Sequence, residues 1–167
     1  MNGTHIHLLL NHVSILAALF SVLIYITGYI KKNDSIKSTA LTGFVLAALT
    51  AIPVFLTGEP AEESIENIPG VLKSAIESHE EAAEIALWLI EITGIIALAG
   101  LFSKKIKFVT TSTFSILMVV LSLCSSVSIS YAGYLGGKIR HTELSSTTIS
   151  NGANEGGQGE GGEKDED

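Results

Sequence analysis

Long apolar stretches alternate with short polar segments along most of the chain. Residues 8–30, 40–57, 85–102 and 108–135 are nearly free of Lys, Arg and Asp, and charges gather between these stretches and near the C-terminal end. A soluble helix would instead carry its charges along one face. Apolar stretches of about 18 to 25 residues match the hydrocarbon core of a bilayer at about 1.5 Å per residue. Because a backbone in lipid must pair its own amides, the pattern predicts four transmembrane helices.

Short polar links join the first helix to the second and the third to the fourth, so each pair is expected to be antiparallel. The predicted fold is all-α: an integral membrane, up-down four-helix bundle. After about residue 144 the chain is rich in Ser, Thr, Gly and acidic residues, which bury too little apolar surface to become ordered. We expect a transmembrane domain over 1–144, a disordered acidic tail over 145–167, and helices over about 6–30, 38–57, 79–102 and 108–135.

Turn-forming residues mark the ends of these helices. Pro53 is expected to kink the second helix near its end, and residues 57–60 (Thr-Gly-Glu-Pro) are expected to terminate it. The acidic loop over 59–80 has room for a short helix after Pro69. The third long helix is expected to begin near His79 at the latest.

Basic residues gather in the two short links, where six lysines face one acidic residue, Asp34: Lys31, Lys32, Lys37, Lys104, Lys105 and Lys107. Cytoplasmic loops carry an excess of Lys and Arg. Both termini and the loop over 59–80 are therefore expected on the outer, periplasmic face of a bacterial inner (plasma) membrane. Residues 1–7 contain no Lys or Arg, unlike the start of a signal peptide, so we expect the first apolar stretch to be retained as a helix.

Composition narrows the classes of function. The net charge of −7 includes six acidic residues between Glu155 and Asp167, in the tail. The single cysteine, Cys124, rules out an intrachain disulfide and a covalent haem attachment through paired cysteines. Motifs for phosphate binding, nucleophilic hydrolysis and zinc proteolysis are absent from the sequence. We expect an electron-transfer or accessory membrane subunit rather than a stand-alone enzyme, and no nucleic-acid partner.

All five histidines fall on the expected outer half of the bundle: His5, His7, His12, His79 and His141. Neutral imidazole is the usual protein ligand of haem iron and also suits zinc and copper. Two of His12, His79 and His141 are therefore candidate ligands of a b-type haem. For each histidine the alternative is an interfacial side chain bonded to a carbonyl or to lipid headgroups.

The last helix offers features that suit a flat cofactor. Small residues recur every three or four positions: Ser122, Ser126, Ser130, Gly133 and Gly137. Such a stripe admits either a flat ligand or a closely packed neighbouring helix. Arg140, with Lys138, is placed to neutralise haem propionates; the alternative is that both side chains reach to the lipid headgroups.

Three glutamates lie along one face of the third long helix: Glu80, Glu84 and Glu91. Glu91 lies about halfway along the expected span, where an ionisable group is costly and often functional. The three are candidates for a proton relay from the outer surface. The alternative for Glu91 is a protonated side chain bonded to hydroxyl groups of the next helix.

Several segments resemble a bacterial four-helix membrane family catalogued as domain of unknown function 2231. They are Asn11-His12-Val13, Thr57-Gly58, His79 and the run from Gly133 to His141, which is similar to the family's Gly-x-x-Gly-Gly segment with a following basic residue and histidine. The chain departs from that pattern at Val13-Ser14, where relatives often have Phe-Pro, and at residues 142–144, where they are Gly-rich. The resemblance covers roughly residues 8–144 and implies a redox setting with His12, His79 and His141 as site residues.

Taken together, these features predict a membrane-embedded redox subunit that binds haem b near the periplasmic face and transfers electrons. Its expected partners are the lipid bilayer and other membrane or periplasmic electron-transfer proteins, with oligomerisation left open. A second hypothesis is a membrane protein that binds a single transition-metal ion, with His5 and His7 joining the site. A third is a cofactor-free structural or assembly subunit of a membrane complex.

Overall fold

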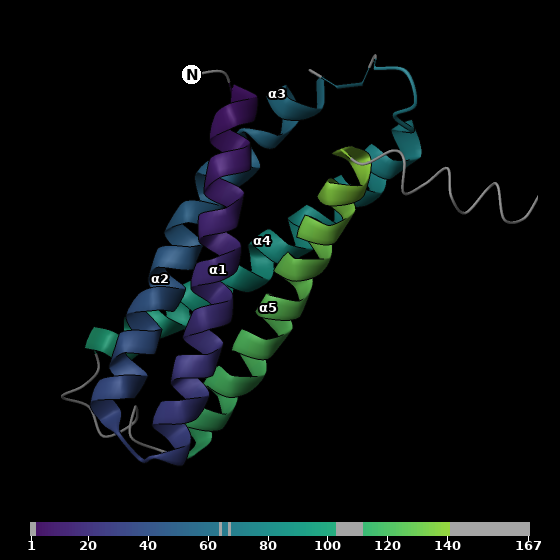
Figure 1. The fold of residues 1–167 in the computed structure, drawn as a ribbon. Coiled ribbons are helices and arrows are strands. Elements are labelled where there is room, and N and C mark those ends of the chain that lie inside the picture. Colours follow the sequence, from purple (N-terminus) through teal and green to yellow (C-terminus); the bar gives the residue numbers. More distant parts are fainter. Residues whose placement is uncertain (1–2, 64, 67, 103–111, 141–167) are drawn as a thin grey trace, which may run out of the picture.

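The computed structural model describes residues 3–63, 65–66, 68–102 and 112–140, and the regular elements in these segments are all α-helices. They are α1 (Gly3–Ile30), α2 (Asp34–Leu56), α3 (Gly58–Glu63), α4 (Lys73–Phe102) and α5 (Ser112–Arg140) (Figure 1). By length and composition, α1, α2, α4 and α5 can each cross a membrane. This result confirms the predicted all-α class and the four transmembrane-length helices.

Several helices extend beyond the stretches that hydropathy marks. The helix α4 begins at Lys73, six residues before the predicted start at 79, and α5 continues to Arg140 rather than ending at 135. The Asn33 side chain caps α2 by accepting hydrogen bonds from the amides of Ser35 and Ile36, at 3.0 and 3.1 Å. This cap starts α2 at Asp34, four residues before the predicted start at 38, so the helix includes a polar first turn outside the apolar stretch. The predicted tail over 145–167 and residues 103–111 lie outside the described segments.

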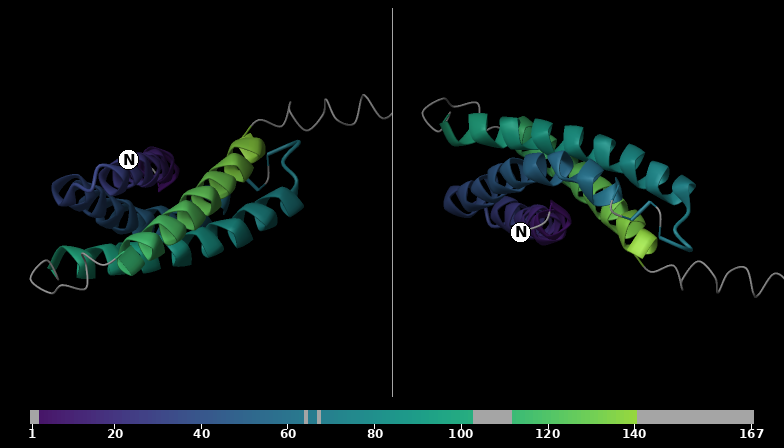
Figure 2. Two further views of the ribbon diagram at one scale, coloured as in Figure 1. Left: turned by 90° about the horizontal axis from the view of Figure 1, so that it is seen from below. Right: turned by 90° about the horizontal axis from the view of Figure 1, so that it is seen from above.

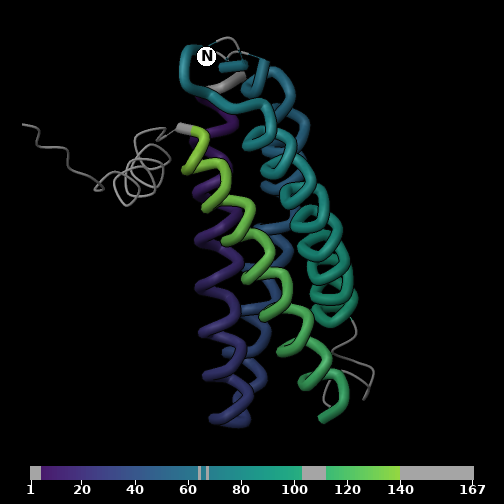
Figure 3. The backbone as a smooth tube through the Cα atoms, turned by 90° about the vertical axis from the view of Figure 1, so that its right-hand side faces the viewer, coloured from purple at the N-terminus to yellow at the C-terminus, as the bar shows by residue number. Residues whose placement is uncertain are grey.

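The loop contains a short helix that the sequence did not indicate. The helix α3 directly follows the C-cap of α2 at Thr57, and the helix indicated after Pro69 is the beginning of α4, which starts at Lys73. Pro60 falls in the first turn of α3, where a backbone N–H needs no partner, so it does not break the helix. Figure 3 shows α3, the beginning of α1 and the end of α5 at one end of the molecule, hereafter the α3 end.

The helices pack as two pairs, α1 with α2 and α4 with α5, and the pairs meet mainly through α2 and α4. At this seam a Cβ atom on Gly94 would overlap that of Ala48. Within the second pair, the hydroxyls of Thr93 and Ser125 lie 2.7 Å apart in the buried interior. The pairs cross at an angle, so α1 and α5 diverge toward the α3 end (Figures 1 and 2).

Two buried clusters divide the core by side-chain size. Toward the α3 end the cluster is mostly alanine: Ala18, Ala47, Ala51, Ala82, Ala86, Ile90, Ile129 and Ala132. The other cluster holds bulkier groups, including Tyr25, Phe44, Phe114 and Met118. Because alanine fills little volume, diverging helices lined by it leave a space between them. The small residues therefore place an opening at the α3 end.

Candidate functional site

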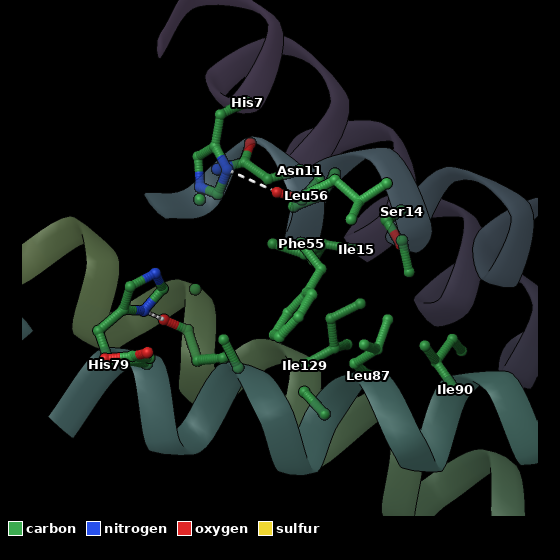
Figure 4. A pocket seen from close by; sticks show the side chains of 18 of the residues that line it. His7, Asn11, Ser14, Ile15, Phe55, Leu56, His79, Leu87, Ile90 and Ile129 are labelled. Atoms are coloured by element: carbon green, nitrogen blue, oxygen red, sulfur yellow. Dashed lines mark hydrogen bonds between the residues drawn. The ribbon is translucent and has the colours of Figure 1, made fainter. Parts of the chain in front are cut away.

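A cavity of about 480 Å³ lies between the two helix pairs at the α3 end. Its inner part is apolar, with Leu87, Ile90 and Ile129 lying away from the histidines (Figure 4). Its polar lining comes from α1, α3 and α4: His7, Asn11, Ser14, Glu59, Glu62, His79 and Glu80. The cavity thus joins an apolar interior to a polar, acidic mouth, an arrangement common in ligand sites.

His7 reaches the cavity from α1 and is half-buried. Its Nδ1–H donates to the Val54 carbonyl oxygen at 2.9 Å. Val54 belongs to the last turn of α2, and its carbonyl oxygen also accepts from the Thr57 hydroxyl at 3.1 Å and from the Thr57 amide at 3.3 Å. The end of α2 therefore supplies the acceptor that orients the His7 ring.

His79 enters the cavity from α4, on the opposite side (Figure 4). Its Nδ1–H donates to the Ala132 carbonyl oxygen of α5 at 3.0 Å. Ala132 is buried, and His79 is half-buried against it. The bond joins α4 to α5 and holds the ring at the cavity wall.

The two imidazoles share one electronic arrangement. A carbonyl oxygen only accepts, so Nδ1 carries the proton in both His7 and His79. In the neutral ring Nε2 then holds a lone pair. Histidines that ligate metals commonly have their other nitrogen bonded in this way to a carbonyl. Each ring can therefore donate its Nε2 lone pair to a Lewis acid, and the two rings come from different helices.

Asn11 and three glutamates add hydrogen-bond acceptors to the cavity. Asn11 Oδ1 is buried and has no hydrogen-bond partner among the described residues. Carboxylates of Glu59, Glu62 and Glu80 line the same space. An assembly of imidazole nitrogens, an amide oxygen and carboxylates favours a cation, a metal centre or a hydrogen-bond donor over an anion.

The Glu62 side chain has an elevated pKa. Burial raises the pKa above its ordinary value of 4.5, and the nearby carboxylates of Glu80 and Glu59 raise it further. The folded protein therefore binds the Glu62 proton more tightly than the unfolded chain does. The resulting stabilisation is complete below pH 4.5 and is lost as the pH rises through the raised value.

Replacing Glu62 by Gln removes this ionisation while keeping a similar shape. The variant is expected to unfold at a higher temperature than the parent protein at pH 7, and at nearly the same temperature close to pH 4. Circular dichroism of the detergent-solubilised protein measures both transitions. Glu63→Gln is the matched control, because Glu63 is an exposed residue of the same helix. Equal shifts for both variants at pH 7 would contradict the assignment.

The histidines predicted from the sequence lie in different places. His79 lines the cavity, whereas His12 is exposed and its Nδ1–H donates to the Leu8 carbonyl of its own helix at 2.7 Å. His5 is also exposed. His141 and the Arg140 side chain lie outside the described part of the chain. Among the described residues no group of three or more His, Cys, Asp or Glu is placed to hold a metal ion, and a site that includes His141 stays a prediction.

Only some residues of the predicted proton relay and of the small-residue stripe line the cavity. Of the three glutamates, Glu80 lines the cavity, Glu84 is exposed, and Glu91 has a buried Oε1 without a hydrogen-bond partner among the described residues. Gly133 lines the cavity, but Gly137 is exposed, with open space where a Cβ would lie. The relay itself stays a prediction.

Three cavity residues were missing from the sequence-based set or given little weight: His7, Asn11 and Glu62. His7, Asn11 and Ser14 are spaced by four and three residues, so they share one face of α1, and this face continues into buried Ala18. That periodicity was a usable signal for His7. Nothing in the local sequence brings Glu62 to the same place, because its position depends on how α3 folds over the bundle.

Comparison of the chain with protein-family models, with curated proteins and with solved structures finds no match. The resemblance to domain of unknown function 2231 gains no support from these comparisons and stays a prediction.

Proposed function

We propose that this protein is a multi-pass membrane redox subunit that binds b-type haem in the cavity, with His7 and His79 as axial ligands. The observation that carries the proposal is the pair of imidazoles from α1 and α4, each with Nδ1–H bonded to a backbone carbonyl. A six-coordinate, electron-transferring haem takes two axial ligands from the protein, and two histidines on separate helices can supply them. When bound, haem supplies one-electron transfer.

The cavity suits the body of a porphyrin in other respects. Its inner walls are apolar, with Phe55 from α2, Leu87 from α4 and Ile129 from α5 facing the same space (Figure 4). Apolar walls exclude water and favour a largely hydrophobic ring. The α1–α5 divergence leaves room that the alanine cluster does not fill.

The positions of the lysines support a cavity that opens toward the periplasmic side of the membrane. Lys31, Lys32 and Lys37 lie at or near the turn between α1 and α2, away from the α3 end. Cytoplasmic loops carry such an excess of Lys and Arg. We therefore propose that the α3 end lies at the periplasmic face of a bacterial inner membrane, where a periplasmic or membrane partner would exchange electrons.

A lone transition-metal ion is the second candidate. The observation that favours it is the acidic mouth, where Glu59, Glu62 and Glu80 line the cavity beside the histidines. Carboxylates stabilise a bare cation but repel the propionates of haem. A copper, iron or zinc ion would use the same Nε2 atoms and complete its coordination with water, since no set of three His, Cys, Asp or Glu among the described residues is placed around one ion.

An optical spectrum and a metal analysis test the two candidates together. We expect full-length protein, purified in detergent from haem-replete cells, to show the reduced-minus-oxidised spectrum of a b-type haem at about one haem per chain. A colourless protein that carries about one equivalent of copper, zinc or non-haem iron would overturn the haem proposal in favour of the second candidate. A protein with neither would overturn both.

A further inference from the structure

The imidazole of His79 lies against the backbone of α5 at Gly136. A Cβ atom at this position would come within 3.0 Å of Cε1 and 3.4 Å of both ring nitrogens of His79. Real side chains rarely make such short contacts, so the His79 ring would have to shift by a few tenths of an ångström if residue 136 carried a Cβ atom. The absence of a Cβ on Gly136 therefore makes the observed ring position possible.

This close approach also explains the hydrogen bond of His79. Gly136 lies four residues after Ala132, so it occupies the next turn of α5 on the same side of the helix. With only a hydrogen atom at Gly136, the ring comes close enough for Nδ1–H to reach the Ala132 carbonyl at 3.0 Å. The carbonyl has a second lone pair beyond the one used in the helix.

We propose that Gly136 is a positioning residue: it forms, with the Ala132 carbonyl, a niche that holds the His79 ring and leaves Nε2 as its metal-donating nitrogen. The proposal rests on the proposed function in treating His79 as a ligand. It also assigns different roles to the two adjacent glycines of α5. Gly136 faces His79 of α4. At Gly137, which belonged to the stripe predicted from the sequence, an added Cβ atom would meet open space.

The adjacent glycines provide a matched pair of variants. Gly136→Ala and Gly137→Ala each add one methyl group and each raise helix propensity by about 1 kcal/mol in an exposed helix. They differ in whether the methyl group meets His79. An effect on the ligand that is confined to Gly136→Ala therefore cannot come from propensity.

The first measurement is binding of added haemin to the full-length protein, prepared without haem in detergent. Gly137→Ala is expected to match the parent protein, whereas Gly136→Ala is expected to bind haemin at least about tenfold more weakly, a typical cost of disturbing the group that orients a ligand. The low-spin signal in electron paramagnetic resonance is expected to change in Gly136→Ala alone. Equal affinity and equal spectra for all three proteins would overturn the niche.

The second measurement tests the niche in the protein without any cofactor, through the protonation state of the His79 ring. Nitrogen-15 NMR of histidine-labelled protein reports which ring nitrogen of His79 carries the proton. We expect Nδ1–H in the parent protein and in Gly137→Ala, with loss of that state in Gly136→Ala. If haemin does not bind but this pattern appears, the haem proposal fails and the niche stands. If His79 shows the same proton state in all three proteins, the niche fails whatever haemin does.

Discussion

Full-length protein with His79 replaced by alanine is expected to lose the haem that we propose it binds. The substitution removes one of the two Nε2 donors in the cavity and the hydrogen bond to Ala132. Disturbing groups that only support a ligand typically costs 10- to 100-fold in affinity, so removal of the ligand itself should cost at least about 100-fold. His7→Ala is expected to have an effect of the same order, since the two rings supply opposite sides of the site. Haem content per chain, from the reduced-minus-oxidised spectrum, measures both losses.

His12→Ala is the matched control for these variants. His12 lies on the same helix as His7, but it is exposed and bonded to the Leu8 carbonyl of its own helix. Its removal is expected to leave the haem content unchanged. A protein that keeps its haem without His79 and loses it without His12 would show that the ligand pair has been wrongly assigned, and would favour the set predicted from the sequence.

The largest expected effect on folding comes from Gly94→Leu. Gly94 is buried where α4 crosses α2, and even a methyl group there would overlap the Cβ of Ala48. Close helix crossings in membranes depend on such small residues. Overpacking costs about 1 to 3 kcal/mol in ordinary cores, and leucine at this position must also push the two helix pairs apart. Titration with a denaturing detergent, followed by circular dichroism, measures the loss of stability.

The control is Ala99→Leu, which adds bulk to an exposed position of the same helix. It is expected to unfold within about 0.5 kcal/mol of the parent protein, as surface substitutions usually do. If Gly94→Leu were as stable as Ala99→Leu, the α2–α4 seam could not be as close as the structure has it.

The helices were predictable from the sequence because lipid imposes a simple rule on long apolar stretches. Which face of a helix turns inward depends on finer differences. On α1, Leu16, Leu19 and Leu23 are exposed along the stripe that follows His12, whereas Ser14 and Ala18 are buried along the stripe that follows His7. The mean hydropathy of the whole stretch identifies the helix but does not say which of these two stripes faces inward. The choice between the two histidines required the small and polar residues to be placed on the inner face.

The candidate site itself was less accessible to prediction. It combines His7 from α1, the end of α2, Glu62 from α3, and His79 docked on the backbone of α5. These contacts depend on how two helix pairs cross, and a single sequence contains no direct record of the crossing angle. A gathering of histidines near one end of the bundle was foreseeable. The niche at Gly136 was not, since only the position of the neighbouring ring distinguishes it from Gly137.

The alanine-rich half of the core has a thermodynamic consequence. The small side chains there leave a cavity of about 480 Å³ between the helix pairs, so a guest molecule of the right shape would contribute packing that the chain does not provide for itself. Its binding free energy would add to the resistance of the whole fold to unfolding, in proportion to the logarithm of its free concentration. In cells with a low concentration of the guest molecule, the protein would be less stable and would be degraded sooner. Its abundance would therefore follow the concentration of its ligand.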